Sequence, residues 1–213
     1  MVSDRYSSQN DSDHFCRFHH PYQGTTMVKL QPGGIYCTDQ AEIICTGLGS
    51  CISACIWDER IGAGGMNHFL LPFVNHNQEM HWHPDNLTTT PARYGIHAME
   101  MLINYLLQRG AERNRLKVKL FGGAQMMGRN SRIGEKNVEF ILSYAQTEKL
   151  DVISHDLGGL EPRKIMFDPL SGRVWLKRIP FAEVHQIKAQ ETQYATELER
   201  KTRRDKNNDV ELF

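Results

Sequence analysis

Runs of apolar residues in the middle of the chain predict a domain built largely from β-strands. The second and third runs are separated by Asp58–Glu59, which predicts a hairpin between them. Glycines in the third run are typical of a strand that packs closely against its neighbours. Pro169–Gly172 predicts a tight turn between the last two runs. The predicted strands cover residues 41–46, 51–57, 62–71, 116–121, 151–155, 164–168 and 173–179.

Apolar positions at three- and four-residue spacing predict two helices between these strands. The first helix begins at Thr90, a suitable N-cap, with Pro91 at its first helical position, and it ends at Gly110. The second covers about residues 134–149. The order of strands, helix, strand, helix and strands predicts a layered α/β sandwich with a mixed β-sheet.

Polar segments flank this predicted domain of residues 27–181. Residues 1–26 contain few aliphatic side chains and predict a flexible N-terminal extension. Residues 182–213 predict a charged C-terminal extension, in which four apolar residues share one narrow helical stripe. Acidic residues are interleaved with the basic ones, so a solvated tail or surface helix fits this extension better than a nucleic-acid arm. The stripe consists of Val184, Ile187, Tyr194 and Leu198.

Composition narrows the function classes. The chain has 213 residues, enough for one domain with a full core, and its 25 Lys and Arg residues balance its 25 Asp and Glu residues. We therefore expect neither nucleic acid nor an anionic membrane surface as a partner. No apolar run is long enough to cross a bilayer, and Met1–Gln9 lacks the apolar stretch of a secretory signal, which predicts a cytoplasmic protein without membrane insertion. The five cysteines are then expected to be free thiols.

The segment Thr46–Cys51, with the sequence TGLGSC, is the strongest chemical signal. Glycines allow the backbone to turn tightly and leave amide N–H groups accessible. Such groups around Gly49 and Ser50 can stabilise the oxyanion that forms when a nucleophile attacks a carbonyl carbon. Cys51 follows directly and is the candidate nucleophile, because a thiol beside a base ionises readily.

His68 is the candidate base, in the segment Gly64–Pro72. If the second and third predicted strands pair as a hairpin, the imidazole and the Cys51 thiol come within reach of each other. The residue pattern alone leaves a second interpretation open, because a cysteine in a strand is usually a small core residue and a histidine in an apolar strand is usually structural.

The block TGLGSCISACIWDERIGAGGMNHFLLP, Thr46–Pro72, resembles the signature of the CheD family of bacterial chemoreceptor glutamine deamidases. The resemblance extends over about Val28–Ile179. It includes Arg93–Tyr94, the segment Lys119–Ala124 and the segment Ile133–Asn137. It also includes Asp156–Gly159 and the hairpin Arg163–Val174.

The resemblance implies a fold similar to the catalytic domain of cytotoxic necrotizing factor toxins and a catalytic Cys51–His68 pair. It implies deamidation of receptor glutamines through a cysteine thioester, with no cofactor and no metal. The family's third catalytic residue, a threonine six positions before the cysteine, corresponds to Cys45 here, and Thr46 is the neighbouring candidate. Adjacent strand residues face opposite ways, so Thr46 replaces that side chain only if the segment shifts. Cys45 is alternatively space-filling, or its carbonyl orients the imidazole.

The resemblance also implies two partners, the cytoplasmic helical region of chemoreceptors and a CheC-type phosphatase. Three alternatives stay open at this point. The first is that the chain is a chemotaxis adaptor without catalytic activity. The second is that it hydrolyses glutamate methyl esters in addition to deamidating glutamines. The third is that it is a metal hydrolase. The last alternative places a metal in the polar segment that contains His76, His81, His83 and Asp85, although this segment lacks a zinc-type framework. Gly122–Gly123 favours a close backbone approach over a phosphate loop, because the lysine of such loops is missing.

Overall fold

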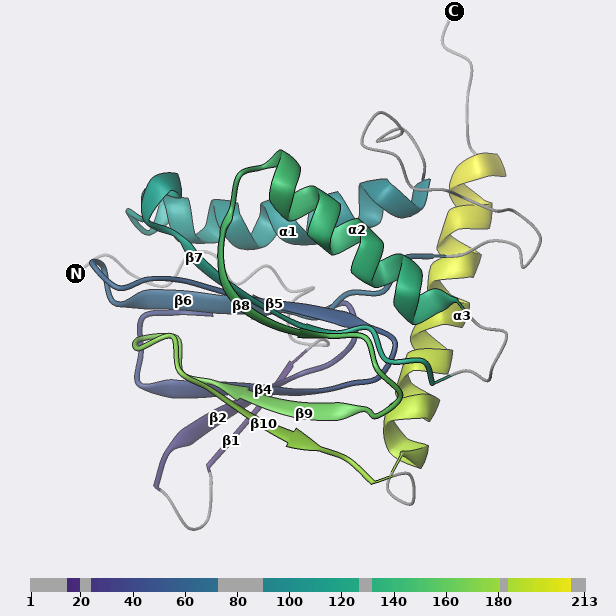
Figure 1. The fold of residues 1–213 in the computed structure, drawn as a ribbon, viewed down its shortest axis with the longest axis horizontal. Coiled ribbons are helices and arrows are strands. Elements are labelled where there is room, and N and C mark those ends of the chain that lie inside the picture. The colour runs from purple at the N-terminus through teal and green to yellow at the C-terminus, as the bar shows by residue number, and fades with distance from the viewer. Residues whose placement is uncertain (1–14, 20–23, 73–89, 127–131, 181–183, 208–213) are drawn as a thin grey trace, which may run out of the picture.

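Two β-sheets packed face to face form the centre of the molecule, and helices cover one outer face and one end (Figure 1). The computed structural model describes residues 15–19, 24–72, 90–126, 132–180 and 184–207. Each sheet has five strands and contains one parallel pair, so both sheets are mixed. The layered α/β fold predicted from the sequence is therefore confirmed, but its strands form two mixed sheets where one mixed sheet was expected. The likeness to the toxin catalytic domain stays a prediction.

The first sheet has the strand order β1-β2-β4-β9-β10. Strands β2 and β4 are parallel, and the other neighbours are antiparallel. The turn predicted at Pro169–Gly172 joins β9 to β10, where Gly172 N donates to Asp168 O at 2.9 Å. The strands are β1 (Phe15–His19), β2 (Thr26–Leu30), β4 (Glu42–Leu48), β9 (Arg163–Phe167) and β10 (Val174–Arg178).

The second sheet has the strand order β3-β6-β5-β7-β8. Strands β5 and β6 form the predicted hairpin, in which Asp58 pairs with Ala63. Strand β7 is antiparallel to β5 and parallel to β8. The strands are β3 (Ile35–Thr38), β5 (Ile52–Asp58), β6 (Ala63–Asn67), β7 (Lys117–Gly122) and β8 (Asp151–Leu157).

Two amphipathic helices, α1 (Thr90–Gln108) and α2 (Ile133–Thr147), pack on the outer face of the second sheet (Figure 1). The apolar faces of these helices and the side chains of β5 and β7 that face them make one core cluster. A second cluster fills the space between the two sheets. The short 3-10 helix η2 (Arg113–Arg115) leads into β7. None of the helices in the described part of the chain is long and apolar enough to span a membrane.

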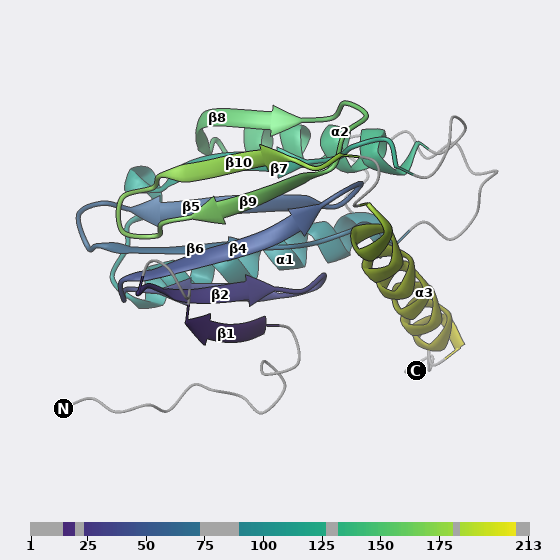
Figure 2. The same ribbon diagram turned by 90° about the horizontal axis from the view of Figure 1, so that it is seen from below.

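Helix α3 (His185–Asn207) lies at one end of the sandwich and crosses the ends of both sheets (Figures 1 and 2). The apolar stripe seen in the sequence faces inward: Val184 and Ile187 are 9% exposed and Leu198 is 2% exposed. Tyr194 and Ala195 pack against the cluster between the sheets. Within the extension expected at residues 182–213, His185–Asn207 thus forms a helix that packs on the sheets, which fits the surface helix of the two interpretations given above.

Three strands lie outside the sequence-based assignment. Strand β1 falls within residues 1–26, so residues 15–19 of the extension expected to be flexible form a paired strand, while residues 1–14 and 20–23 lie outside the described residues. Strands β2 and β3 are too short and too irregular in polarity for a periodic signal. They form because each adds hydrogen bonds to an existing sheet edge, which depends on long-range pairing.

Candidate active site

Cys51 lies where the chain crosses from one sheet to the other. Strand β4 of the first sheet ends at Leu48, and β5 of the second sheet begins at Ile52. The three residues between them, Gly49–Cys51, bridge the sheets at the end of the sandwich that α3 covers. The Cys51 side chain is fully buried.

The carbonyl groups of this three-residue connection all point into the molecule. Ala124 N donates to Gly49 O at 2.7 Å, and Gly123 N donates to Cys51 O at 2.8 Å. Between them, the buried Asn137 side chain of α2 donates from Nδ2 to Ser50 O at 2.8 Å. The carbonyls are thereby fixed, and the three N–H groups point the other way.

These three N–H groups converge on the carboxylate of Glu191 in α3. Gly49 N and Cys51 N donate to Oε1 at 2.8 and 3.1 Å. Ser50 donates to Oε2 from its backbone N at 2.9 Å and from its Oγ at 2.7 Å. Consecutive N–H groups that converge on the two oxygens of one carboxylate have the character of an oxyanion-binding site.

His68 follows β6 and is held from both sides of its backbone. Its N donates to Gly34 O at 2.9 Å, and its O accepts from Gly33 N at 2.7 Å. The ring Nδ1 lies 2.8 Å from Thr46 Oγ1, which also bonds to Leu30 O at 3.0 Å. A hydroxyl has one proton, and the Leu30 carbonyl can only accept, so Thr46 Oγ1 donates to Leu30 O and accepts a hydrogen bond from Nδ1–H of His68. The tautomer inferred from this network leaves Nε2 as the basic nitrogen, which is buried without a hydrogen-bond partner.

Cys51, His68 and Glu191 meet at one point. The Cys51 Sγ, a ring nitrogen of His68 and a carboxylate oxygen of Glu191 all lie within 4.8 Å of one another. These three residue types can hold a metal ion such as zinc. Both carboxylate oxygens, however, already accept hydrogen bonds from Gly49, Ser50 and Cys51. The surrounding donors therefore fit a bound anion better than a bound cation.

Burial keeps both candidate catalytic side chains uncharged in this arrangement. The pKa of the Cys51 thiol is raised well above its usual value, first by burial and then by the charge and hydrogen bonding of Glu191. Burial also lowers the pKa of His68 to about 4, against a smaller opposing effect of Glu191. A neutral thiol therefore faces a neutral imidazole while Glu191 is in place.

The residue that reaches the imidazole is Thr46 and not Cys45. Thr46 is 2% exposed and bonds to His68 from the inner face of the first sheet. Cys45 precedes it, pairs across the strands with Lys29 of β2 and Met166 of β9, and has a buried side chain. Position 46 in this chain thus offers the hydroxyl contact that the family resemblance implies for position 45.

The matched family model is described as CheD chemotactic sensory transduction and covers residues 77–178. A protein of Vibrio vulnificus (strain CMCP6), named "Probable chemoreceptor glutamine deamidase CheD", is 59% identical over 204 residues, which are 96% of this chain and 94% of its own. The chain belongs to the CheD family. A Vibrio cholerae (strain ATCC 39541 / Classical Ogawa 395 / O395) protein with the same name is 55% identical and covers 93% of this chain and 84% of its own.

More distant CheD relatives are also similar over nearly the whole chain. A Halorhodospira halophila (strain DSM 244 / SL1) protein, again named "Probable chemoreceptor glutamine deamidase CheD", is 42% identical over 200 residues. Those residues are 94% of this chain and 90% of the relative. An aligned region of this length has to span the Thr46–Cys51 connection and His68.

The sequence did not single out two important residues of this CheD chain, although Asn137 ends the segment Ile133–Asn137 that resembles the family. Glu191 is one of many charged residues in a polar segment, and Asn137 is one polar residue in an amphipathic helix. Only their burial, 2% and 0% exposed, sets them apart. Gly122 does meet its expectation of close backbone approach: its φ is +115°, and a Cβ there would lie 2.0 Å from Cys51 O. The histidine-rich segment that contains His76, His81, His83 and Asp85 lies outside the described residues.

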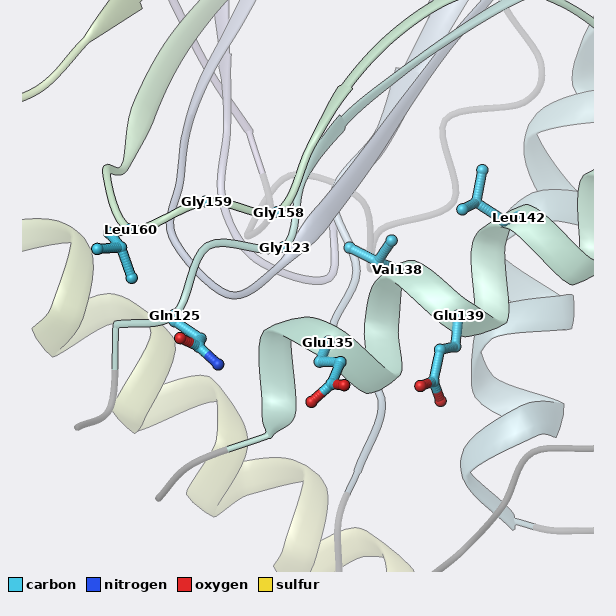
Figure 3. Close-up of a pocket in the computed structure, with 9 residues that line it drawn as sticks. All are labelled: Gly123, Gln125, Glu135, Val138, Glu139, Leu142, Gly158, Gly159 and Leu160. Carbon is cyan, nitrogen blue, oxygen red and sulfur yellow. The ribbon is translucent and has the colours of Figure 1, made fainter. Parts of the chain in front are cut away.

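Figure 3 shows a surface pocket lined by residues of α2 and of two neighbouring backbone segments. Its walls come from α2 and from the backbone at Gly123 and Gly158–Gly159, and it includes the exposed side chains of Leu142 and Leu160. Gly123 is shared, because it lines the pocket while its N–H holds the Cys51 carbonyl. In the described part of the chain, none of Cys51, His68 and Thr46 lines this pocket.

Proposed function

We propose that this CheD-family chain deamidates specific glutamine side chains of methyl-accepting chemotaxis receptors to glutamate through a cysteine thioester. The names of its relatives support the substrate, because they describe chemoreceptor glutamine deamidases. The geometry around Cys51 supports the chemistry. The single observation that carries the proposal is that three consecutive N–H groups converge beside a buried Cys51–His68 pair.

The first half of the proposed reaction releases ammonia. His68 Nε2 takes the proton of Cys51, and the thiolate attacks the carboxamide carbon of the substrate glutamine. The N–H groups of Gly49, Ser50 and Cys51 stabilise the oxyanion of the tetrahedral intermediate, and one such donor contributes about 3 kcal/mol. The C–N bond breaks as His68 gives its proton to the departing nitrogen, which leaves a thioester and ammonia.

The second half restores the enzyme. Water attacks the thioester carbon while His68 Nε2 accepts a proton from that water. The C–S bond then breaks, and His68 returns the proton to sulfur, which gives glutamate and the Cys51 thiol. Thr46 keeps the imidazole in the tautomer that both halves require. The proposed chemistry uses no metal and no organic cofactor.

The proposed substrate is a glutamine on the cytoplasmic helical region of a receptor. Hydrolysis of a glutamate methyl ester follows the same thioester route and belongs to the same proposal. A CheC-type phosphatase as a further partner stays a prediction.

Conversion of receptor glutamines provides the test. Purified receptor cytoplasmic fragments are incubated with the wild type and with Glu191→Ala, which frees the N–H groups, and glutamate formation is followed by peptide mass spectrometry. Cys51→Ala and His68→Ala should each abolish conversion, because one removes the nucleophile and the other removes the base. Chelators should leave conversion unchanged.

Cys55→Ala is the matched control, since Cys55 is also a fully buried cysteine but lies four residues further along the chain, within β5. It should retain conversion. If Cys51→Ala still converts receptor glutamines, the proposed site is wrong. If neither the wild type nor Glu191→Ala converts any glutamine while both still bind receptor fragments, the chain is an adaptor.

A further inference from the structure

Helix α3 places a carboxylate where the proposed reaction forms one. Glutamate is the product of glutamine deamidation, and the Glu191 side chain brings both of its oxygens onto the N–H groups of Gly49–Cys51. One of these oxygens lies within 4.8 Å of the Cys51 Sγ. In the described part of the chain, the hydrogen-bond partners of the Glu191 carboxylate are Gly49, Ser50 and Cys51 alone.

The surface beneath α3, which we call its seat, has a glycine opposite each of three α3 side chains. A Cβ on Gly47 would lie 3.0 Å from Ile187 Cδ1, and a Cβ on Gly49 would lie 2.9 Å from Glu191 Oε2. A Cβ on Gly33 would lie 2.8 Å from the ring of Tyr194. Three glycines from two separate segments thus leave room for one face of a helix over about two turns.

Apolar contacts and a polar contact hold the helix on either side of Glu191. Ile187 lies one turn before it and Leu198 two turns after it, and both are buried. Gln190 Nε2 donates to Gln31 Oε1 at 3.2 Å. The carboxylate is therefore presented from a continuous helical face and not from a loose chain end.

We propose that the surface beneath α3 is the surface that receives the substrate helix, and that α3 occupies it as an internal product-like helix. This inference rests on the proposed function and adds two statements to it. The substrate presents its glutamine from a helix that takes the seat of α3. Because α3 and the substrate need the same N–H groups, α3 has to leave before a receptor glutamine reaches Cys51.

Access to the Cys51 thiol tests the seating of α3 without requiring any deamidation. In the full chain, Ile187→Asp places a charge in the buried seat and should raise the iodoacetamide alkylation rate of Cys51 by about tenfold or more. Thr192→Asp adds the same charge on the exposed face of α3 and should leave the rate unchanged. The exposed Cys16 in each sample provides the internal reference.

The same helix can report on the chemistry. In the full-length Glu191→Gln variant, the oxygen of the introduced carboxamide can accept from the N–H groups beside Cys51, and the carboxamide should be converted to glutamate within the chain. Adding Cys51→Ala should abolish this conversion. Glu197→Gln makes the matched change at an exposed position of α3 and should stay glutamine.

Receptor conversion links the two measurements. Ile187→Asp should convert receptor fragments several-fold faster than the wild type. An unchanged alkylation rate of Cys51 in Ile187→Asp would overturn the inference. It would also be overturned if alkylation became faster while Cys51-dependent conversion of receptor glutamines kept the wild-type rate. If alkylation rises while neither the carboxamide introduced by Glu191→Gln nor any receptor glutamine is converted, α3 does cover Cys51 and the deamidase proposal is the part that fails.

Discussion

At the scale of single residues, the alternation of strand side chains decides which group orients the imidazole. Thr46 has the same parity in β4 as Ile44 and Leu48, whose side chains lie in the core between the sheets. Cys45 has the opposite parity. The hydroxyl of Thr46 therefore faces His68, and its bond to Nδ1 leaves Nε2 free for the proposed proton transfer.

Thr46→Val should lower kcat for receptor deamidation by about 10- to 100-fold, with a smaller effect on KM. Valine keeps the shape but leaves the buried Nδ1–H without an acceptor, at about 1–3 kcal/mol. Steady-state kinetics on receptor fragments measure the change. Thr46→Ser should recover most of the rate, and Cys45→Ala should stay near the wild type. Equal losses in Thr46→Ser and Thr46→Val would contradict an orienting hydroxyl.

At the scale of elements, two segments hold the Gly49–Cys51 connection that forms the candidate oxyanion site. The residues after β7 and the helix α2 bind the carbonyls of Gly49, Ser50 and Cys51. Asn137 also accepts from Leu71 N at 3.1 Å through Oδ1, so it ties the segment after His68 to the Cys51 connection. This double role explains why a polar side chain is fully buried in an amphipathic helix.

Asn137→Asp should destabilise the protein by about 3 kcal/mol, because it replaces the buried donor to Ser50 O with a charged acceptor. Urea unfolding measures the loss. Glu139→Gln, on the exposed face of the same helix, should change stability by less than about 0.5 kcal/mol. If Asn137→Asp lowers the free energy of unfolding no more than the control does, the hydrogen bond from Asn137 to Ser50 O does not stabilise the fold.

At the scale of the whole molecule, the site depends on water being excluded between two sheets and a closing helix. The buried His68 has a pKa of about 4, compared with 6.5 for an exposed histidine. The unfolded chain therefore binds a proton at this position between those two pH values, and the folded chain does not. The resulting stabilisation is present above pH 6.5 and is lost as the pH falls toward 4.

The free energy of unfolding should thus fall between pH 6.5 and 4 by roughly 3 kcal/mol through His68. Urea titrations across this range provide the measurement, and His68→Gln should remove this part of the slope. His155→Gln, at an exposed position of β8, is the control and should keep the slope of the wild type. The same slope in His68→Gln and in the wild type would show that His68 is not the buried neutral group described here.

Much of the fold could be predicted because its signals are local. The hairpin of β5 and β6 follows from two apolar runs around Asp58–Glu59, and α1 follows from Thr90, Gly110 and the helical spacing between them. The division of the strands into two sheets could not be predicted in the same way. It depends on which strand edges meet, and β4 and β5 are neighbours in sequence yet belong to different sheets.

The sequence by itself determined that a glycine-rich bend carries Cys51 and that a following strand leads to His68, since both depend on short-range backbone geometry. Tertiary structure alone decided that Thr46 faces the imidazole, that Asn137 fixes the bend, and that Glu191, 140 residues after Cys51, fills the anion-binding N–H groups. The physical reason is that a hydrogen bond depends on distance in space. A charged residue in a polar helix has no local feature that identifies the partner it meets.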